Sequence, residues 1–152
     1  TFVGNKQLKC NPTDERLKAY CDTMDKLNLD AHICSVAFSD SPLLKNMAIR
    51  KMLMEDKPDG ITCTDDLTAI LVLQEAKKLG IRVPEDLKVI GFDGTKQIQT
   101  YHSELSTIAQ PISDISTLLV DLLLERINDP KKEPNQMHYK LPVKLIKNET
   151  TA

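Results

Sequence analysis

The chain has 152 residues, a length that suits one domain with a substantial buried core. Its 20 Lys and Arg residues nearly balance its 22 Asp and Glu residues, and no basic run supplies the positive surface that nucleic-acid binding requires. We therefore expect that this chain by itself does not bind DNA.

The cysteines occur singly, without CxxC spacing, inside apolar patterns. This arrangement favours buried free thiols over a zinc site or a disulfide framework, and we expect no metal and no cofactor. The sequence shows no signal peptide and no apolar run that could span a bilayer, which predicts a cytoplasmic chain without a membrane partner. A start at Thr1 rather than Met leaves room for a preceding segment. The cysteines are Cys10, Cys21, Cys34 and Cys63.

The first predicted unit is a strand at residues 1–4 followed by a helix. Asn11 and Pro12 supply an N-cap and a first helical residue, and apolar side chains then recur on one helix face. That face consists of Leu17, Tyr20, Cys21, Met24 and Leu27.

A second unit begins with the β-like segment His32 to Phe38. Ser41 followed by Pro42 opens a helix that ends before Pro58. This helix carries the apolar residues Leu44, Met47, Ala48 and Met52.

The third unit pairs a short strand at Gly60 to Cys63 with a helix that ends at Leu79. Thr64 or Asp65 caps the helix, and its apolar face is wide enough to serve both a core and a partner. The face consists of Ile70, Leu71, Leu73, Ala76 and Leu79.

The next stretch, IRVPEDLKVIGFDGT, places the carboxylate of Asp93 just beyond a predicted strand. Gly80 stands where a left-handed residue ends a helix, and Pro84 prevents the helix from resuming. The apolar run from Leu87 to Phe92 fits a strand that is covered on both faces. Ligands of open α/β sheets are held beyond such strands, and a carboxylate there can accept hydrogen bonds from adjacent hydroxyls. The alternative is a turn residue that caps its own backbone.

After this strand, the sequence pattern predicts an irregular segment at Lys96 to Glu104 and a strand at Ser106 to Ala109. An apolar helix at Ser113 to Asn128 and a final strand at His138 to Lys147 follow. Strands that alternate with helices form parallel βαβ units with right-handed crossovers. We therefore predict an α/β fold with a doubly wound, mainly parallel sheet.

Asp65 and Asp66 follow a strand, so they should lie at the same sheet edge as Asp93. One interpretation is a magnesium site for phosphoryl transfer, as in receiver domains, although Lys96 is badly placed for the lysine that such a site needs. The other is that Asp65 or Asp66 caps the helix while Asp93 alone faces a ligand. We favour capping.

Arg16 lies in the first turn of its helix, where an exposed salt bridge is the default role. Its planar fork would also suit neighbouring sugar hydroxyls or a carboxylate. No nucleophile elbow lies near a histidine, and the glycines are not clustered into a phosphate-binding loop. We therefore expect no enzymatic activity.

Three segments, TDDLTAILVLQEAKKLG, IRVPEDLKVIGFDGT and LSTIAQP, together carry a family resemblance. They make nearly the whole chain resemble the effector-binding core of lactose-repressor (LacI/GalR) family transcription regulators, and the closing KLPVKLIKNETT resembles the terminal strand of that family. The resemblance implies a periplasmic-binding-protein-like fold in which two subdomains hold a small sugar effector. Within it, the GFDGT and QPI stretches favour sucrose or a related saccharide.

By motif, Arg16 matches the arginine that contacts sugar hydroxyls, and Asp93 matches the aspartate that receives them. Asp65 stands where an asparagine usually helps to bind ligand. An asparagine amide both donates and accepts hydrogen bonds, whereas the Asp65 carboxylate only accepts them. Gln110 matches a polar cleft residue, and Phe38 lies near an aromatic that stacks on the sugar ring.

The resemblance also implies that residues 1–152 are a partial effector-binding and dimerisation domain, mostly its C-terminal subdomain. No helix-turn-helix is present, so operator DNA would be bound only through an N-terminal domain outside this sequence. Residues 113–128 would form a crossover helix that packs on an N-terminal subdomain, also outside it. A homodimer surface is implied at Ile70, Leu73, Gln74 and Tyr101.

The predicted function is therefore effector sensing and dimerisation in a sugar-responsive repressor, with ligand binding changing operator affinity allosterically. Two alternatives stay open. One is an extracytoplasmic sugar-binding protein of a transporter, and the other is a magnesium-dependent receiver or phosphoryl-transfer domain.

Overall fold

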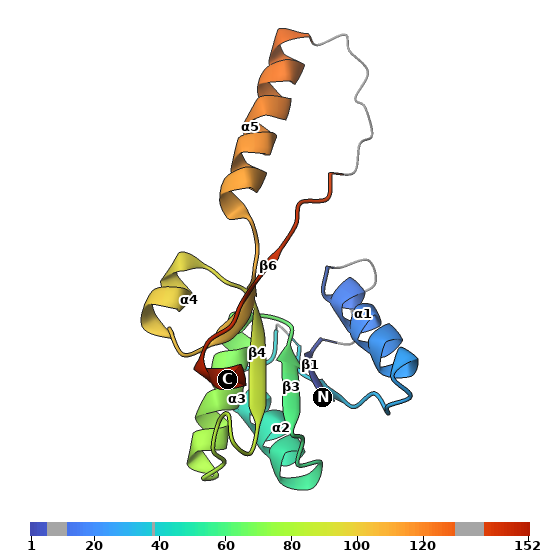
Figure 1. Cartoon of the computed structure of the whole chain (residues 1–152), viewed down its shortest axis with the longest axis vertical. Helices are drawn as coiled ribbons and strands as arrows, with labels where there is room; N and C mark the ends of the chain where they lie inside the picture. The colour runs from blue at the N-terminus through green and yellow to red at the C-terminus, as the bar shows by residue number, and fades with distance from the viewer. Residues whose placement is uncertain (6–11, 38, 130–138) are drawn as a thin grey trace.

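The structure is a computed structural model that describes residues 1–5, 12–37, 39–129 and 139–152. Strands and helices alternate along the chain from β1 to β5 (Figure 1), and up to β4 this alternation is the one that the sequence predicts. The elements are β1 (Phe2–Gly4), α1 (Pro12–Lys26), β2 (Ile33–Ser35), α2 (Pro42–Glu55), β3 (Gly60–Cys63), α3 (Asp66–Lys78), β4 (Lys88–Asp93), α4 (Lys96–Tyr101), β5 (Ser106–Ala109), α5 (Ile112–Asn128), β6 (Lys144–Ile146) and the 3-10 helix η1 (Glu149–Thr151).

The strands form one six-stranded sheet in the order β2-β1-β3-β4-β5-β6. All neighbours pair in parallel except β5 and β6, which are antiparallel. The predicted mainly parallel, doubly wound sheet is thus confirmed. Because the strand order reverses beside β1, the carboxyl ends of β1 and β3 lie next to each other at a topological switch point, where open α/β sheets bind ligands.

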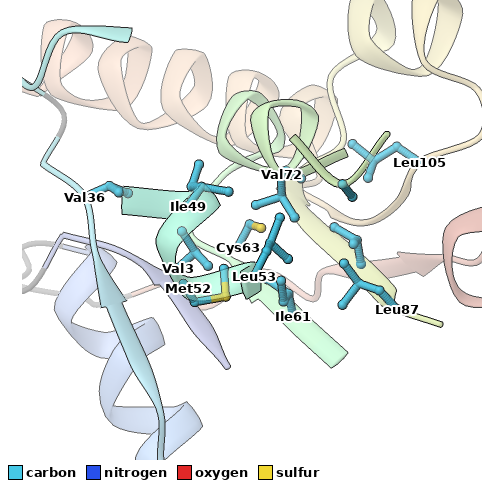
Figure 2. Close-up of a cluster of buried hydrophobic side chains, with 13 residues drawn as sticks. Val3, Val36, Ile49, Met52, Leu53, Ile61, Cys63, Val72, Leu87 and Leu105 are labelled. Atoms are coloured by element: carbon cyan, nitrogen blue, oxygen red, sulfur yellow. The ribbon is translucent and has the colours of Figure 1, made fainter. Parts of the chain in front are cut away.

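The core lies between the sheet and helices α2 and α3 (Figure 2). On α2 the buried residues are Ile49, Met52 and Leu53. Of the apolar residues noted in the sequence, Leu44 and Met47 are instead exposed. The labelled core side chains are Val3, Val36, Ile49, Met52, Leu53, Ile61, Cys63, Val72, Leu87 and Leu105.

Several local predictions are confirmed by the backbone. The Ser41 hydroxyl accepts a hydrogen bond from the Leu44 N–H (3.3 Å) at the start of α2, and the Asp65 carboxylate accepts one from the Thr68 N–H (2.7 Å) at the start of α3. Gly80 has a φ of 73° after α3, as expected for a left-handed residue that ends a helix. The predicted cap Asn11 lies outside the described residues.

The cysteines in the described part of the chain are free thiols. Cys63 is buried, and Cys21 and Cys34 are half-buried, so full burial is correct only for Cys63. Burial raises the pKa of the Cys63 thiol well above its usual value, because a thiolate is poorly solvated there. Cys10 lies outside the described residues.

Three boundaries differ from the predictions. Lys96–Tyr101 is the helix α4 rather than an irregular segment, because the Thr95 hydroxyl caps it by accepting from the Ile98 N–H (3.3 Å). The strand predicted at 32–38 is shortened to β2, which pairs only with the three residues of β1. The strand predicted at 138–147 is shortened to β6, which pairs with the last three residues of β5.

Helix α5 extends away from the sheet along the longest axis of the chain (Figure 1). None of its residues is buried. No helix in the described ranges has both the length and the apolar character that crossing a membrane requires.

Candidate functional site

The candidate site lies where the strands of the parallel sheet reach their carboxyl ends. Thr64 follows β3, Asp93 is the last residue of β4, and Gln110 follows β5. The pairing of Asp93 with Ala109 brings the ends of β4 and β5 into register. Asp93 and Gln110 therefore lie at one sheet edge, as predicted.

Arg16 reaches this edge from α1. Its guanidinium donates a hydrogen bond to the Thr64 carbonyl (2.7 Å), and its central carbon lies 3.7 Å from the centroid of the Phe92 ring. Packing of Tyr20 against Phe2, with ring centroids 5.8 Å apart, holds α1 beside β1. An exposed salt bridge is thus the wrong interpretation of Arg16. A cation that lies over an aromatic ring is attracted by the ring's quadrupole, so contacts within the chain itself hold the Arg16 guanidinium in place.

Asp93 has an unusual backbone conformation, with a φ of 116°. Few non-glycine residues adopt positive φ. The side-chain amide of Gln110 donates to the Asp93 carboxylate (2.7 Å), and the Gln110 N–H donates to the Asp93 carbonyl (3.0 Å). Two predicted site residues are therefore in direct contact.

Asp65 acts as the N-cap of α3, since its Oδ1 accepts the hydrogen bond from Thr68. The capping interpretation of this residue is confirmed, and one of its two carboxylate oxygens is thereby engaged. Substituting Asn, the residue that the family usually has there, would preserve a cap because Asn is an equally good N-cap.

Asp66 is buried, with 2% of its surface exposed. Its Oδ1 accepts from the Thr107 hydroxyl (2.5 Å), and its Oδ2 accepts from the Gly94 N–H (2.8 Å). Burial raises the pKa of Asp66 from its usual value, and the nearby charges of Asp93 and Asp65 raise it further, although both hydrogen bonds oppose this shift.

No group of three His, Cys, Asp or Glu residues within the described ranges could hold a metal ion. Both oxygens of Asp66 and one oxygen of Asp65 are used by donors of the fold itself. The geometry at this edge therefore differs from the cluster of open carboxylates that a magnesium-binding receiver domain would use.

Three side chains with different hydrogen-bonding roles meet at this edge. The Arg16 guanidinium donates, the Asp93 carboxylate accepts, and the Gln110 amide can donate and accept. This set suits a neutral ligand with adjacent hydroxyl groups. Sequence reasoning missed the roles of Phe92 and Asp66, which contact Arg16 and Gly94 respectively. The sequence features that could have indicated these roles are the aromatic residue of GFD, Phe92, and the second aspartate of TDD, Asp66. Phe38 lies outside the described residues.

The residues predicted for a dimer surface lie on α3 and α4. Ile70 and Leu73 are half-buried and also pack against the core, whereas Gln74 is exposed and Tyr101 is 76% exposed. Leu67, on the same helix as Ile70, is a further exposed apolar side chain.

The sequence of the chain is similar to those of bacterial repressors. It is 46% identical over 146 residues to a sucrose operon repressor of Pediococcus pentosaceus and 39% identical over 144 residues to one of Lactococcus lactis subsp. lactis. These stretches are 96% and 95% of this chain but 44% and 43% of the repressors. The chain therefore spans less than half the length of these curated relatives.

Solved structures of longer proteins share the fold. A LacI family transcriptional regulator from Enterococcus faecium with bound ribose superposes with a TM-score of 0.82 at 26% identity, over 99% of this chain and 55% of that one. One from Arthrobacter sp. FB24 in complex with lactose gives 0.79 at 25% identity, over 99% and 57%. The family model described as a periplasmic binding protein-like domain matches residues 1–151. The chain thus belongs to the family of periplasmic binding protein-like domains, and its relatives include sucrose operon repressors.

Proposed function

We propose that this chain is the effector-sensing part of a sugar-responsive transcriptional repressor. The observation that carries the proposal is the placement of Arg16, Asp93 and Gln110 at the carboxyl edge of the sheet, with Arg16 fixed on Phe92 and Asp93 bonded to Gln110. The names of the relatives and the ribose and lactose in the related structures agree with a sugar effector.

In this proposal the effector is sucrose or a related saccharide. Arg16 donates to its hydroxyls, Asp93 accepts from them, and Gln110 and the second carboxylate oxygen of Asp65 add polar contacts. Phe38 stacks on the sugar ring. No step changes a covalent bond, so the protein is a sensor rather than an enzyme.

The sensor is part of one effector domain, mostly its C-terminal subdomain. Operator DNA is bound by an N-terminal domain outside residues 1–152. Sugar binding changes the arrangement of the subunits and thereby the affinity of the repressor for its operator. The second wall of the sugar site is also outside these residues, and α5 packs against it. This arrangement explains why a helix with exposed Leu119, Leu123 and Ile127 extends away from the sheet. Such a repressor works in the cytoplasm.

The protein is a homodimer through Ile70, Leu73, Gln74 and Tyr101. The exposed ring of Tyr101 and the exposed Leu67 support this surface, because aromatic and apolar side chains are enriched at the centres of interfaces. Substituting Tyr101→Glu should weaken the dimer in sedimentation equilibrium. A dimer of unchanged stability would place the interface elsewhere.

Calorimetric titration with sucrose tests the proposed function. It uses the natural polypeptide that carries this sequence, because the proposal assigns one wall of the site to another segment. We expect Arg16→Lys and Asp93→Asn each to lower the affinity by about ten- to a hundredfold, since a hydrogen bond to a charged group contributes about 1.5–3 kcal/mol. Ribose and lactose serve as comparison ligands.

Two matched variants control for the changes in side chain. Arg50→Lys alters an exposed arginine on α2, and Asp59→Asn alters an exposed aspartate at the opposite edge, before β3. Both should bind sugar like the wild type. Binding that survives in Arg16→Lys and Asp93→Asn, or the absence of saccharide binding in the wild type, would contradict the proposal.

A further inference from the structure

The turn that carries Asp93 has two consecutive residues in left-handed backbone. Asp93 has a φ of 116° and Gly94 has a φ of 60°. Glycine adopts this conformation readily, but for aspartate it is unfavourable and persists only when the surroundings enforce it. Other groups must therefore hold the backbone that presents the Asp93 carboxylate.

Contacts from two other elements hold Gly94. Asp66, at the start of α3, accepts the Gly94 N–H through Oδ2 (2.8 Å), and Gln99, on α4, donates its side-chain amide to the Gly94 carbonyl (2.5 Å). Both polar groups of this glycine are thus bonded to side chains. A bond to a charged acceptor is the stronger kind, so Asp66 provides the firmer hold.

Asp66 is itself fixed in place. The Thr107 hydroxyl from β5 bonds to its other carboxylate oxygen (2.5 Å). Gly91 on β4 leaves the space that the carboxylate occupies, since a Cβ at this position would overlap Asp66 Oδ1. With 2% of its surface exposed, Asp66 is sealed away from any ligand at the edge.

We propose that Asp66 is a positioning residue that sets the Asp93–Gly94 turn through the Gly94 N–H and so aims the Asp93 carboxylate at the effector. That Asp93 faces an effector rests on the proposed function. That Asp66 orients the Asp93 carboxylate rests on the contacts alone. Asp66 links α3, β4 and β5 at one point, so it couples the sugar-facing carboxylate to the frame of the sheet.

Nuclear magnetic resonance of the chain tests the aim of Asp93 without sugar. In Asp66→Ala we expect hydrogen exchange of the Gly94 amide to become at least tenfold faster, and the side-chain amide signals of Gln110 to shift because its partner, Asp93, moves. Asp66→Asn keeps a neutral acceptor and should give a smaller change in the same direction. This second variant protects the test if Asp66→Ala folds poorly.

Thr107 offers a matched pair of controls. Thr107→Ser keeps the hydroxyl that bonds to Asp66 and should leave the Gly94 and Gln110 signals near their wild-type positions. Thr107→Val removes the hydroxyl at nearly constant volume and should shift both. Unchanged Gly94 exchange in both Asp66 variants, or a released Gly94 with unshifted Gln110 signals, would overturn the proposal.

Sugar affinity completes the test in the natural polypeptide. We expect Asp66→Ala to weaken sucrose binding at least tenfold at unchanged folded fraction, and Asp66→Asn to weaken it less. Wild-type affinity in both variants would refute positioning while leaving the proposed function intact. A wild type that binds no saccharide would refute the proposed function, and the Gln110 signals would still decide whether Asp66 aims Asp93.

Discussion

Gly94 and Gly80 both adopt left-handed backbone, but their surroundings differ. A Cβ on Gly94 would lie 2.5 Å from the Cα of Ala109, whereas a Cβ on Gly80 would meet nothing within 4 Å. The first glycine is required by conformation and by space, the second by conformation alone. The close approach of Gly94 to Ala109 also joins the ends of β4 and β5 beside Asp93.

We predict that Gly94→Ala lowers the free energy of unfolding about 2–4 kcal/mol, from left-handed strain and a backbone overlap together. Gly80→Ala should cost only about 1–2 kcal/mol, the strain alone. Urea denaturation of both variants measures the difference. Equal losses at the two positions would mean that the close approach to Ala109 contributes nothing.

The raised pKa of Asp66 gives a second prediction, for the pH dependence of stability. Its folded-state pKa lies above its unfolded value near 3.8, so its protonated form favours folding. This contribution is fully present below the unfolded pKa and is lost as pH rises through the folded pKa. Relative to Asp66→Asn, the wild type should therefore lose stability as pH rises from about 4.

Denaturation with urea across this pH range, with Asp59→Asn as the control, measures the effect. The charged groups that face Asp66 are Asp93 and Asp65, and both carboxylates act in the same direction. If the free energy of unfolding of the wild type instead rises relative to that of Asp66→Asn as pH increases, the hydrogen bonds to Asp66 lower its pKa more than burial raises it.

At the scale of single residues, the sequence predicted what depends on neighbours along the chain. The position of Asp93 after a strand and the cap at Asp65 follow from local pattern. The partners of Arg16 and Asp66 do not, because Arg16 contacts Thr64 48 residues away and Asp66 contacts Thr107 41 residues away. Only the assembled sheet brings them together.

Helix η1 is hydrogen-bonded to the amino-terminal parts of β4 and β5. The buried Thr150 of η1 donates its hydroxyl to the Val89 carbonyl (2.7 Å) and accepts from the Ser106 N–H (2.9 Å). One hydroxyl thus satisfies a backbone acceptor of β4 and a backbone donor of β5. Buried backbone groups without partners are costly, so this short element stabilises the sheet.

We predict that Thr150→Val lowers the free energy of unfolding about 2–4 kcal/mol, because two buried backbone groups lose their partner. Hydrogen exchange at the Ser106 amide should become faster. Thr23→Val, on the exposed side of α1, removes a hydroxyl bonded only to its own helix and should change stability by less than about 0.5 kcal/mol. An unaffected Ser106 amide would contradict the role of η1.

The longer helices have a clear apolar periodicity in the sequence and were predicted, whereas the six-residue helix α4 was not. Helix α3 buries six residues and was found from its apolar periodicity, whereas α4 buries none and was missed. The Thr95 cap alone was too weak a signal. The lengths of β2 and β6 were overestimated because pairing with β1 and β5 limits them, and sequence pattern does not reveal a partner's length.

At the scale of the whole molecule, the sheet and its order are complete without α5. The fold class followed from alternation of strands and helices, but the direction in which α5 leaves the sheet did not, since amphipathic pattern does not specify which surface covers a helix. Its exposed apolar residues are Ile112, Leu119, Val120, Leu123, Leu124 and Ile127.

These exposed residues predict that the chain of residues 1–152 self-associates through α5. Leu119 and Leu123 lie one turn apart on one face, and covering each leucine contributes about 1.5–3 kcal/mol. Sedimentation equilibrium should show a mass that rises with concentration, and Leu119→Gln with Leu123→Gln should reduce that rise. Leu43→Gln with Met54→Gln removes two exposed apolar side chains from α2 and should leave the mass unchanged. If the α5 and α2 variants behave alike, α5 is not the surface that needs cover.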